Sequence, residues 1–270
     1  MNNGRGPAQV EDTNGPQQWY ASLPFVTRNW FTAAVLGTVL ANFGVIPVDK
    51  IYYSYEIVKD EFEIWRLFTN FFFMGSFELG TLIQIYLLYQ YSMNYEANSG
   101  FNTGGGGGTA DFIFMLVFGM IGLLVTGTLF SLGPFYGSQL VNYVMYIWCK
   151  RDPTAQVNIW GFPIQAMYLP FALLILQVFM GNPYILTLQG YAIGHVYYFL
   201  AEVLPKVNAT MVLHTPQFLI SKFGVGEYVQ PRPANGMDAV AGGGGGRPAA
   251  AANNTGGGHN WGRGGQALGR

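Results

Sequence analysis

Six apolar stretches divide this 270-residue chain, and they constrain its fold more than any other feature. They are Trp30–Ile46, Gly75–Tyr91, Phe112–Leu132, Phe135–Cys149, Pro163–Met180 and Pro183–Val203. Several are close to the roughly 20 residues that cross a hydrocarbon core. Half of the residues are hydrophobic and only 10% are charged, whereas about a quarter of a soluble domain is charged. The pattern predicts an all-α, polytopic membrane protein with six transmembrane helices.

Polar side chains interrupt several of these stretches. The fourth is the shortest and contains Gln139 and Asn142, so it is credible only as a helix shielded by its neighbours. Polar residues inside a membrane are costly and mark functional sites. We therefore expect a hydrophilic, laterally open cavity for an unfolded chain, lined by Gln84, Gln139, Asn142 and Gln189.

The basic residues predict the orientation of the chain. Six spans place both termini on one side, and ten of the 13 Lys and Arg residues group with the termini. The other three are Lys50, Lys59 and Arg66. Since cytoplasmic loops carry the excess of positive charge, both termini are predicted to be cytosolic.

Between the first two spans, residues 47–74 alternate acidic with aromatic and aliphatic side chains, which is typical of amphipathic elements lying in the membrane interface. We expect a luminal loop in which Trp65 anchors at the interface and Arg66 binds backbone carbonyls or lipid headgroups.

The remaining segments lack the apolar residues that a core needs. Residues 1–18, the Gly104–Gly108 run and the Gly-rich tail 230–270 are predicted to be disordered, because they cannot offset the entropy of ordering. The expected membrane domain is therefore 19–205, followed by a cytosolic juxtamembrane segment, 206–229.

Neither metal nor nucleic acid is expected as a partner. The three histidines, His195, His214 and His259, are scattered, and Cys149 is the only cysteine. A formal charge of -1 gives no basis for nucleic-acid binding. No cofactor is predicted.

Three runs of residues carry a resemblance to a known family. Gly190-Tyr191-Ala192-Ile193-Gly194-His195 places two glycines on one helix face, a spacing that lets helices approach closely in a bilayer. Together with Trp65-Arg66 and Thr215-Pro216-Gln217-Phe218-Leu219, over roughly residues 19–229, the chain resembles the derlins, rhomboid-like pseudoproteases of the endoplasmic reticulum membrane.

The resemblance implies a role in endoplasmic-reticulum-associated degradation. Members of this family help misfolded proteins to leave the lumen or the membrane for the cytosol, which is called retrotranslocation. The implied partners are membrane lipid, misfolded client proteins, the valosin-containing AAA ATPase and a membrane ubiquitin ligase complex. Homo-oligomerisation stays an open expectation. A membrane scaffold or a small-molecule transporter is a further alternative.

Catalysis is not expected, although an active intramembrane serine protease of rhomboid type remains the enzyme alternative. Such a protease needs Gly-x-Ser-Gly at the fourth span and a histidine in the sixth. Here the run at the fourth span is Tyr136-Gly137-Ser138-Gln139. In rhomboid proteases the histidine precedes two glycines, and counting back from Gly190 and Gly194 by that spacing places Thr187 at its position. His195 lies eight residues later, about 12 Å along a helix. We interpret His195 as structural or cavity-lining.

The tail contains one run that stands out from its surroundings, Asn260 to Gly269. It resembles the short peptide by which some derlins recruit the AAA ATPase, because an aromatic and a leucine anchor bracket glycines that let a strand lie close to a partner. The residues concerned are Trp261, Gly262, Gly264 and Leu268.

Overall fold

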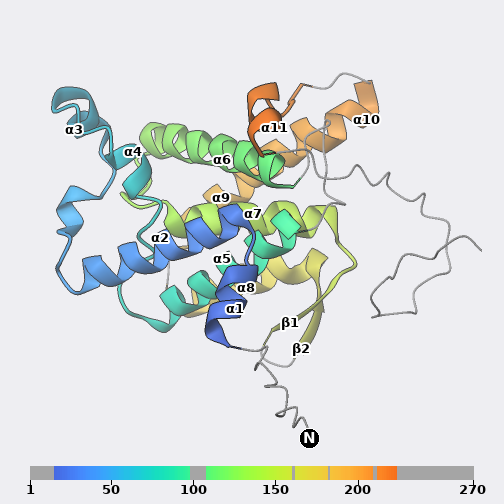
Figure 1. Ribbon diagram of the computed structural model, residues 1–270, viewed down its shortest axis with the longest axis horizontal. Helices are drawn as coiled ribbons and strands as arrows, with labels where there is room; N and C mark the ends of the chain where they lie inside the picture. Colours follow the sequence, from blue (N-terminus) through green and yellow to red (C-terminus); the bar gives the residue numbers. More distant parts are fainter. Residues whose placement is uncertain (1–14, 98–107, 160–161, 182, 209–211, 224–270) are drawn as a thin grey trace, which may run out of the picture. The chain divides into compact units, whose positions relative to one another are not determined.

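The computed structural model describes residues 15–97, 108–159, 162–181, 183–208 and 212–223 (Figure 1). All of them lie in the first of two units, residues 1–231. The Gly104–Gly107 run and the tail, both predicted to be disordered, fall outside the described residues. The predicted disordered segment 1–18 extends too far, because residues 16–18 belong to helix α1 (Pro16–Ser22). Proline is favoured in the first turn of a helix, and Pro16 stands there.

Each predicted apolar stretch contributes a helix to the fold (Figure 1). The six principal helices are α2 (Phe25–Asn42), α5 (Leu79–Ala97), α6 (Thr109–Phe130), α7 (Gly137–Arg151), α8 (Leu169–Phe179) and α9 (Tyr184–Tyr198). The chain is thus mostly helical. Among the described residues, α6 is the one helix long and apolar enough to cross a bilayer, and Ala166–Phe179 is a shorter apolar helix. Six spans therefore remain a prediction.

Helix α6 shows how the principal helices divide their surfaces. Met115, Gly119, Leu123 and Gly127 repeat every four residues and are buried on one face. On the other face Val117, Ile121, Val125 and Leu129 are exposed at the same spacing. A helix that is apolar all round and half exposed suits contact with lipid on its outer side.

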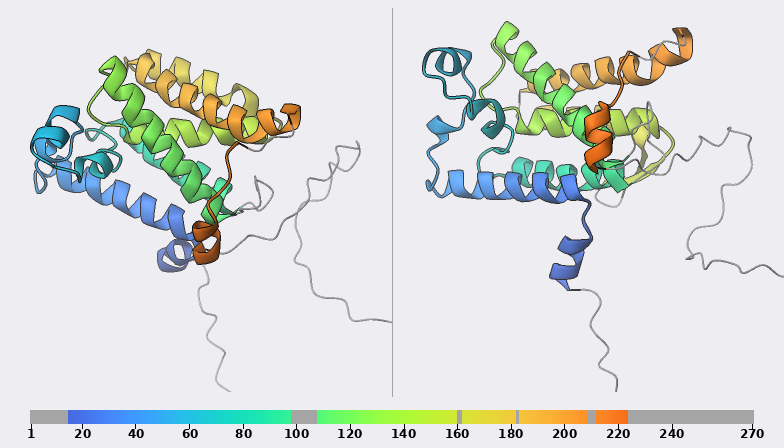
Figure 2. Two further views of the ribbon diagram at one scale, coloured as in Figure 1. Left: turned by 90° about the horizontal axis from the view of Figure 1, so that it is seen from above. Right: turned by 45° about the horizontal axis from the view of Figure 1, so that its top comes forward.

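Helix α7 lies between its neighbours and buries most of its residues, including Gln139 and Asn142. It contacts α5, α6, α8 and α9, and Figures 1 and 2 show it inside the group of helices. Its backbone and amide side chains are therefore shielded by the neighbouring helices, which a polar helix would need if it crossed a membrane.

A β-hairpin occupies the start of the fifth predicted span. Strand β1 (Gln156–Ile159) pairs antiparallel with β2 (Phe162–Gln165), and the 3₁₀ helix η3 (Ala166–Tyr168) leads into α8. The expectation that the span begins at Pro163 is wrong, because the chain there is extended. Proline has no N–H and is tolerated at the edge of a sheet, so hydropathy alone misplaced this boundary.

The sixth apolar stretch continues beyond α9 without a break. A π-helical turn, η4 (Phe199–Val203), is followed by α10 (Leu204–Asn208), so the predicted domain boundary at residue 205 falls within a helix. After the undescribed residues, α11 (Gln217–Phe223) lies against α6 (Figure 2). Phe223 contacts Phe25 at the start of α2, with ring centroids 5.9 Å apart.

The predicted amphipathic loop forms three short helices, η1 (Val48–Lys50), α3 (Tyr55–Asp60) and α4 (Arg66–Thr69). Tyr53 attaches the loop to the bundle: its N–H donates to the Pro134 carbonyl at 2.8 Å, and its hydroxyl lies 2.7 Å from Thr128 Oγ1. Phe62, Ile64 and Phe68 are exposed, so the loop presents an apolar surface at the end of the bundle opposite the hairpin (Figure 1).

Candidate functional site

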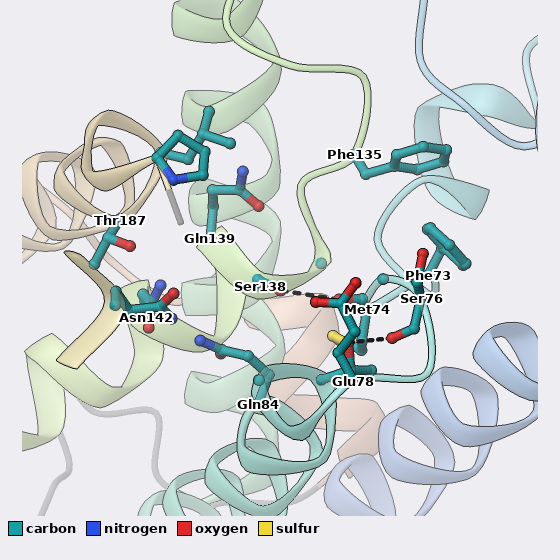
Figure 3. Close-up of a pocket in the computed structure, with 17 residues that line it drawn as sticks. Phe73, Met74, Ser76, Glu78, Gln84, Phe135, Ser138, Gln139, Asn142 and Thr187 are labelled. Atoms are coloured by element: carbon teal, nitrogen blue, oxygen red, sulfur yellow. Dashed lines mark hydrogen bonds between the residues drawn. The ribbon is translucent and has the colours of Figure 1, made fainter. Parts of the chain in front are cut away.

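A cavity of about 240 Å³ opens among the first turns of α5, α7 and α9 and the end of α8 (Figure 3). Its described lining combines apolar residues with polar, mostly uncharged ones in about equal measure, and Glu78 is the one ionisable residue among them. The lining residues are Phe73, Met74, Gly75, Ser76, Glu78, Gly80, Thr81, Gln84, Phe135, Gly137, Ser138, Gln139, Asn142, Gln177, Pro183, Leu186 and Thr187. We call this space the polar cavity.

Three of the four side chains expected in a cavity line this one: Gln84, Gln139 and Asn142. Gln139 and Asn142 are three residues apart on α7 and share a face of that helix. Figure 3 shows Gln84 of α5 facing Asn142 and Ser138 of α7. Two helices distant in sequence thus supply amide groups to one space.

Gln84 carries an unused hydrogen-bonding group. The residue is only 4% exposed, and its Oε1 has no hydrogen-bond partner within the described part of the chain. A buried polar atom without a partner costs about 1–3 kcal/mol. Gln84, which lines the cavity, therefore keeps a hydrogen-bonding capacity that the described part of the chain does not use.

Gln189, the fourth expected residue, lies elsewhere. Its Nε2 donates to the Leu123 carbonyl at 3.1 Å and to Thr126 Oγ1 at 2.9 Å, both on α6. It joins α9 to α6 rather than lining the polar cavity.

Ser138 lines the polar cavity, but the histidine does not. Ser138 Oγ donates to the Met74 carbonyl at 3.3 Å, and Thr187 faces the same space. His195 is exposed, and its Nδ1 lies 2.9 Å from the Tyr146 hydroxyl. No histidine is among the described residues that line the cavity, and Glu78 is the one ionisable side chain that shares it with Ser138.

The glycine pair brings α9 close to α7. A Cβ at Gly190 would lie 2.5 Å from the Gln139 carbonyl oxygen, and one at Gly194 would lie 3.0 Å from the Tyr146 ring. The first contact is with backbone, which cannot rotate away. Because Gln139 and Asn142 flank Gly190, this close packing also forms one wall of the polar cavity.

Trp65 and Arg66 organise the loop. Arg66 is 3% exposed and donates to the Asp49 and Tyr52 carbonyls at 2.7 and 2.9 Å, and its Nε lies 2.5 Å from Glu63. These carbonyls belong to the loop itself, not to the six principal helices. Trp65 is half exposed and donates to the Lys50 carbonyl at 3.3 Å.

A charged network at the other end of the helices was not predicted. Arg151, at the end of α7, binds Glu202 and the Tyr95 hydroxyl, and lies 3.9 Å from Asp111. Asp111 also accepts hydrogen bonds from Tyr95 at 3.1 Å and from Thr215 at 3.2 Å. We call these groups the charged network.

Glu96 adds to this end of the molecule by capping a helix. Its carboxylate accepts from the Val26 and Thr27 N–H groups at 2.9 and 2.7 Å and from the Thr27 and Thr109 hydroxyls. The first N–H groups of α2 have no partner within their own helix, and the carboxylate also favours the positive end of the helix dipole. The sequence signal was an acidic residue near an end of two apolar stretches, Glu96 after the second and Asp111 before the third, which also fits a solvated flank.

Two remaining expectations concern metals and the tail. Among the described residues, no three His, Cys, Asp or Glu side chains gather in a way that could hold a metal ion. Trp261, Gly262, Gly264 and Leu268, the expected ATPase-binding residues, lie outside the described residues.

Comparisons with known proteins identify relatives over most of the chain. A model of the Der1-like family matches residues 23–217. Derlin-1.2 of Zea mays is 33% identical over 83% of this chain and 93% of its own length. Derlin-2 of Oryza sativa subsp. japonica is 34% identical over 81% of this chain and 90% of its own length. Derlin-1 of Arabidopsis thaliana is 33% identical over 84% of this chain and 85% of its own length.

Proposed function

This chain belongs to the Der1-like family, and we propose that it is a non-catalytic component of endoplasmic-reticulum-associated degradation that assists retrotranslocation of misfolded proteins. The family is membrane-associated and is related to this degradation pathway. The proposed location is the endoplasmic reticulum membrane, with several spans and both termini in the cytosol.

The polar cavity is the observation that carries the proposal. An unfolded chain exposes backbone N–H and C=O groups that lose their hydrogen bonds to water when they enter a membrane. The cavity supplies uncharged amide and hydroxyl groups, and one of its lining amides, that of Gln84, has an oxygen without a partner among the described residues. Such groups serve any sequence, because every residue except proline offers the same main-chain donor and acceptor.

The placement of Ser138 supports a role without catalysis. A serine nucleophile needs a neighbouring base to take its proton, and Ser138 instead donates toward the Met74 carbonyl. Thr187, which faces the same cavity, is not basic. The site therefore favours binding of a chain over cleavage of one.

The work of extraction would come from outside the membrane domain. We propose that the tail residues Trp261 to Leu268 recruit the valosin-containing AAA ATPase, and that a membrane ubiquitin ligase complex marks the client. Short helices such as α7 and α8 would thin the bilayer nearby and shorten the apolar path that the client crosses.

The central experiment is site-specific photocrosslinking in cells that express a misfolded luminal reporter. A crosslinker at Thr187, inside the polar cavity, is expected to capture the reporter. The control position is Val125, which is exposed on the outer face of α6 and should capture none. Crosslinks from Thr187 to stable membrane neighbours alone would favour a scaffold and contradict the proposal.

A second variant separates binding from proteolysis. Ser138→Ala removes one hydroxyl and should leave reporter degradation within about twofold of the wild type. A rhomboid-type protease would lose cleavage of its membrane substrate altogether when purified, since the serine forms the covalent intermediate. That loss would establish the enzyme alternative.

A further inference from the structure

A second and larger cleft, of about 660 Å³, lies at the hairpin end of the molecule. Helices α5 and α8 form its sides, with Leu82, Tyr86, Leu173 and Leu176 among the apolar lining. Gln90 and Asn94 of α5 and Gln156 and Asn158 of β1 form its polar part, and Ala155 and Val157 also line it. We call this space the hairpin cleft.

The hairpin cleft continues the path that starts in the polar cavity. A small space of about 10 Å³ between α5 and α8 shares Gly80 and Gln177 with the polar cavity. It shares Ile83, Leu87, Leu173 and Leu176 with the hairpin cleft. The two larger spaces are thus the ends of one seam between α5 and α8, which is closed at its middle.

Strand β1 presents its edge to the hairpin cleft. Successive side chains of a strand point to opposite faces of a sheet. Four consecutive residues, Ala155 to Asn158, nevertheless line the cleft. These four residues alternate between the two faces of the sheet, so a cleft that contacts all of them runs along the edge of the strand. The main-chain N–H and C=O groups of β1 lie at that edge.

The pairing of the hairpin shows which main-chain groups face that edge. Ala166 N–H donates to the Ala155 carbonyl at 2.8 Å, and the register pairs Gln156 with Gln165 and Asn158 with Pro163. Hydrogen-bonded and non-bonded pairs alternate in an antiparallel ladder. The N–H and C=O groups of Gln156 and Asn158 therefore point away from β2, and Pro163 stands opposite Asn158, where no N–H is needed.

We propose that the hairpin cleft binds an extended polypeptide segment, which pairs with the free edge of β1 as a third strand. Main-chain pairing gives affinity without sequence preference, and the side-chain amides of Gln90 and Asn94 face the same space. A lipid acyl chain would fill the apolar part but would leave the strand edge unpaired. The inference rests on the proposed function, since the segment is that of a client leaving the polar cavity along the seam.

Proline substitutions at the edge test this directly. Asn158→Pro and Gln156→Pro each remove one outward N–H without removing a bond between β1 and β2, and proline is tolerated at a sheet edge. Asn158→Ala is the matched control, because it removes the side chain and keeps the N–H. Val157→Pro is the disruptive control, since the N–H of Val157 points toward β2.

The full-length protein is reconstituted in vesicles that contain a reduced, carboxymethylated polypeptide in the luminal space. Photocrosslinkers at Asn94 and at Thr187 report the hairpin cleft and the polar cavity separately. We expect either edge proline to lower crosslinking from Asn94 about tenfold, as expected when one buried hydrogen-bonding group loses its partner. Asn158→Ala should stay within twofold, and crosslinking from Thr187 should not change.

Each other result has a definite meaning. Crosslinking from Asn94 that is equal in Asn158→Pro, Gln156→Pro and the wild type would overturn strand pairing. Crosslinking from Thr187 without any from Asn94 would also overturn it and would leave the proposed function standing. Absence of crosslinks from Thr187 in the wild type would overturn the proposed function, and this inference with it.

Discussion

The charged network and the polar cavity lie at opposite ends of the same helices and satisfy their polar groups differently. At one end Glu96, Asp111, Arg151 and Glu202 are buried or half-buried, and each has charged or hydrogen-bonded partners. At the other end Gln84 has an amide oxygen without one. Paired polar groups hold helices together, whereas an unpaired buried group carries a free-energy cost that a ligand supplying the missing hydrogen bond would relieve.

Among the variants that test this comparison, Arg151→Met is expected to have the largest effect on stability. The change leaves the carboxylates of Asp111 and Glu202 without their cation in a site where the side chain of Arg151 is only 3% exposed. Loss of one partner from a buried ion pair costs about 3–5 kcal/mol. We expect that decrease in the free energy of unfolding in mixed micelles.

The control for Arg151 is Arg28→Met. Arg28 makes no ion pair within the described residues and is only partly buried, so a change below about 0.5 kcal/mol is expected. Equal effects of the two substitutions would show that the charged network does not hold the helices together.

A second test acts on the wall of the polar cavity. Gly190→Ala places a methyl group 2.5 Å from the Gln139 carbonyl oxygen, so α9 must move away from α7. Overpacking of this kind costs about 1–3 kcal/mol, to be measured as above. Ala192→Leu, on an exposed position of the same helix, should change the stability by less than about 0.5 kcal/mol. An unchanged stability of Gly190→Ala would contradict the close packing.

The smallest effect on stability is expected for Gln84→Leu, which removes a polar group without a partner. Stability should stay the same or rise by up to about 1 kcal/mol, while client crosslinking from Thr187 falls severalfold. Gln189→Leu is the matched control with the opposite expectation, because its Nε2 is paired, although its Oε1, like that of Gln84, has no partner among the described residues. It leaves the Leu123 carbonyl and Thr126 without their donor, so stability falls by about 1 kcal/mol and crosslinking persists. Identical behaviour of the two variants would remove the distinction between the two kinds of polar group.

Hydropathy located the principal helices because each is apolar over most of its length, and this signal is local. It misplaced the start of the fifth span, where Pro163 belongs to a strand. Polarity within a predicted span singled out four residues, of which Gln84, Gln139 and Asn142 line the polar cavity and Gln189 binds α6. All four are polar residues within an apolar stretch, so the sequence does not separate them. Only the hydrogen bonds of Gln189 to Leu123 and Thr126 on α6 distinguish it from the other three.

The sequence by itself determined that this is a mostly helical chain of the Der1-like family, because apolar stretches and short motifs depend on neighbouring residues. The tertiary structure alone decided which polar groups are paired. Arg151 meets Glu202 51 positions away, and Glu96 meets Val26 70 positions away. A hydrogen bond requires atoms within about 3 Å, and only the packing of the helices brings such distant residues that close.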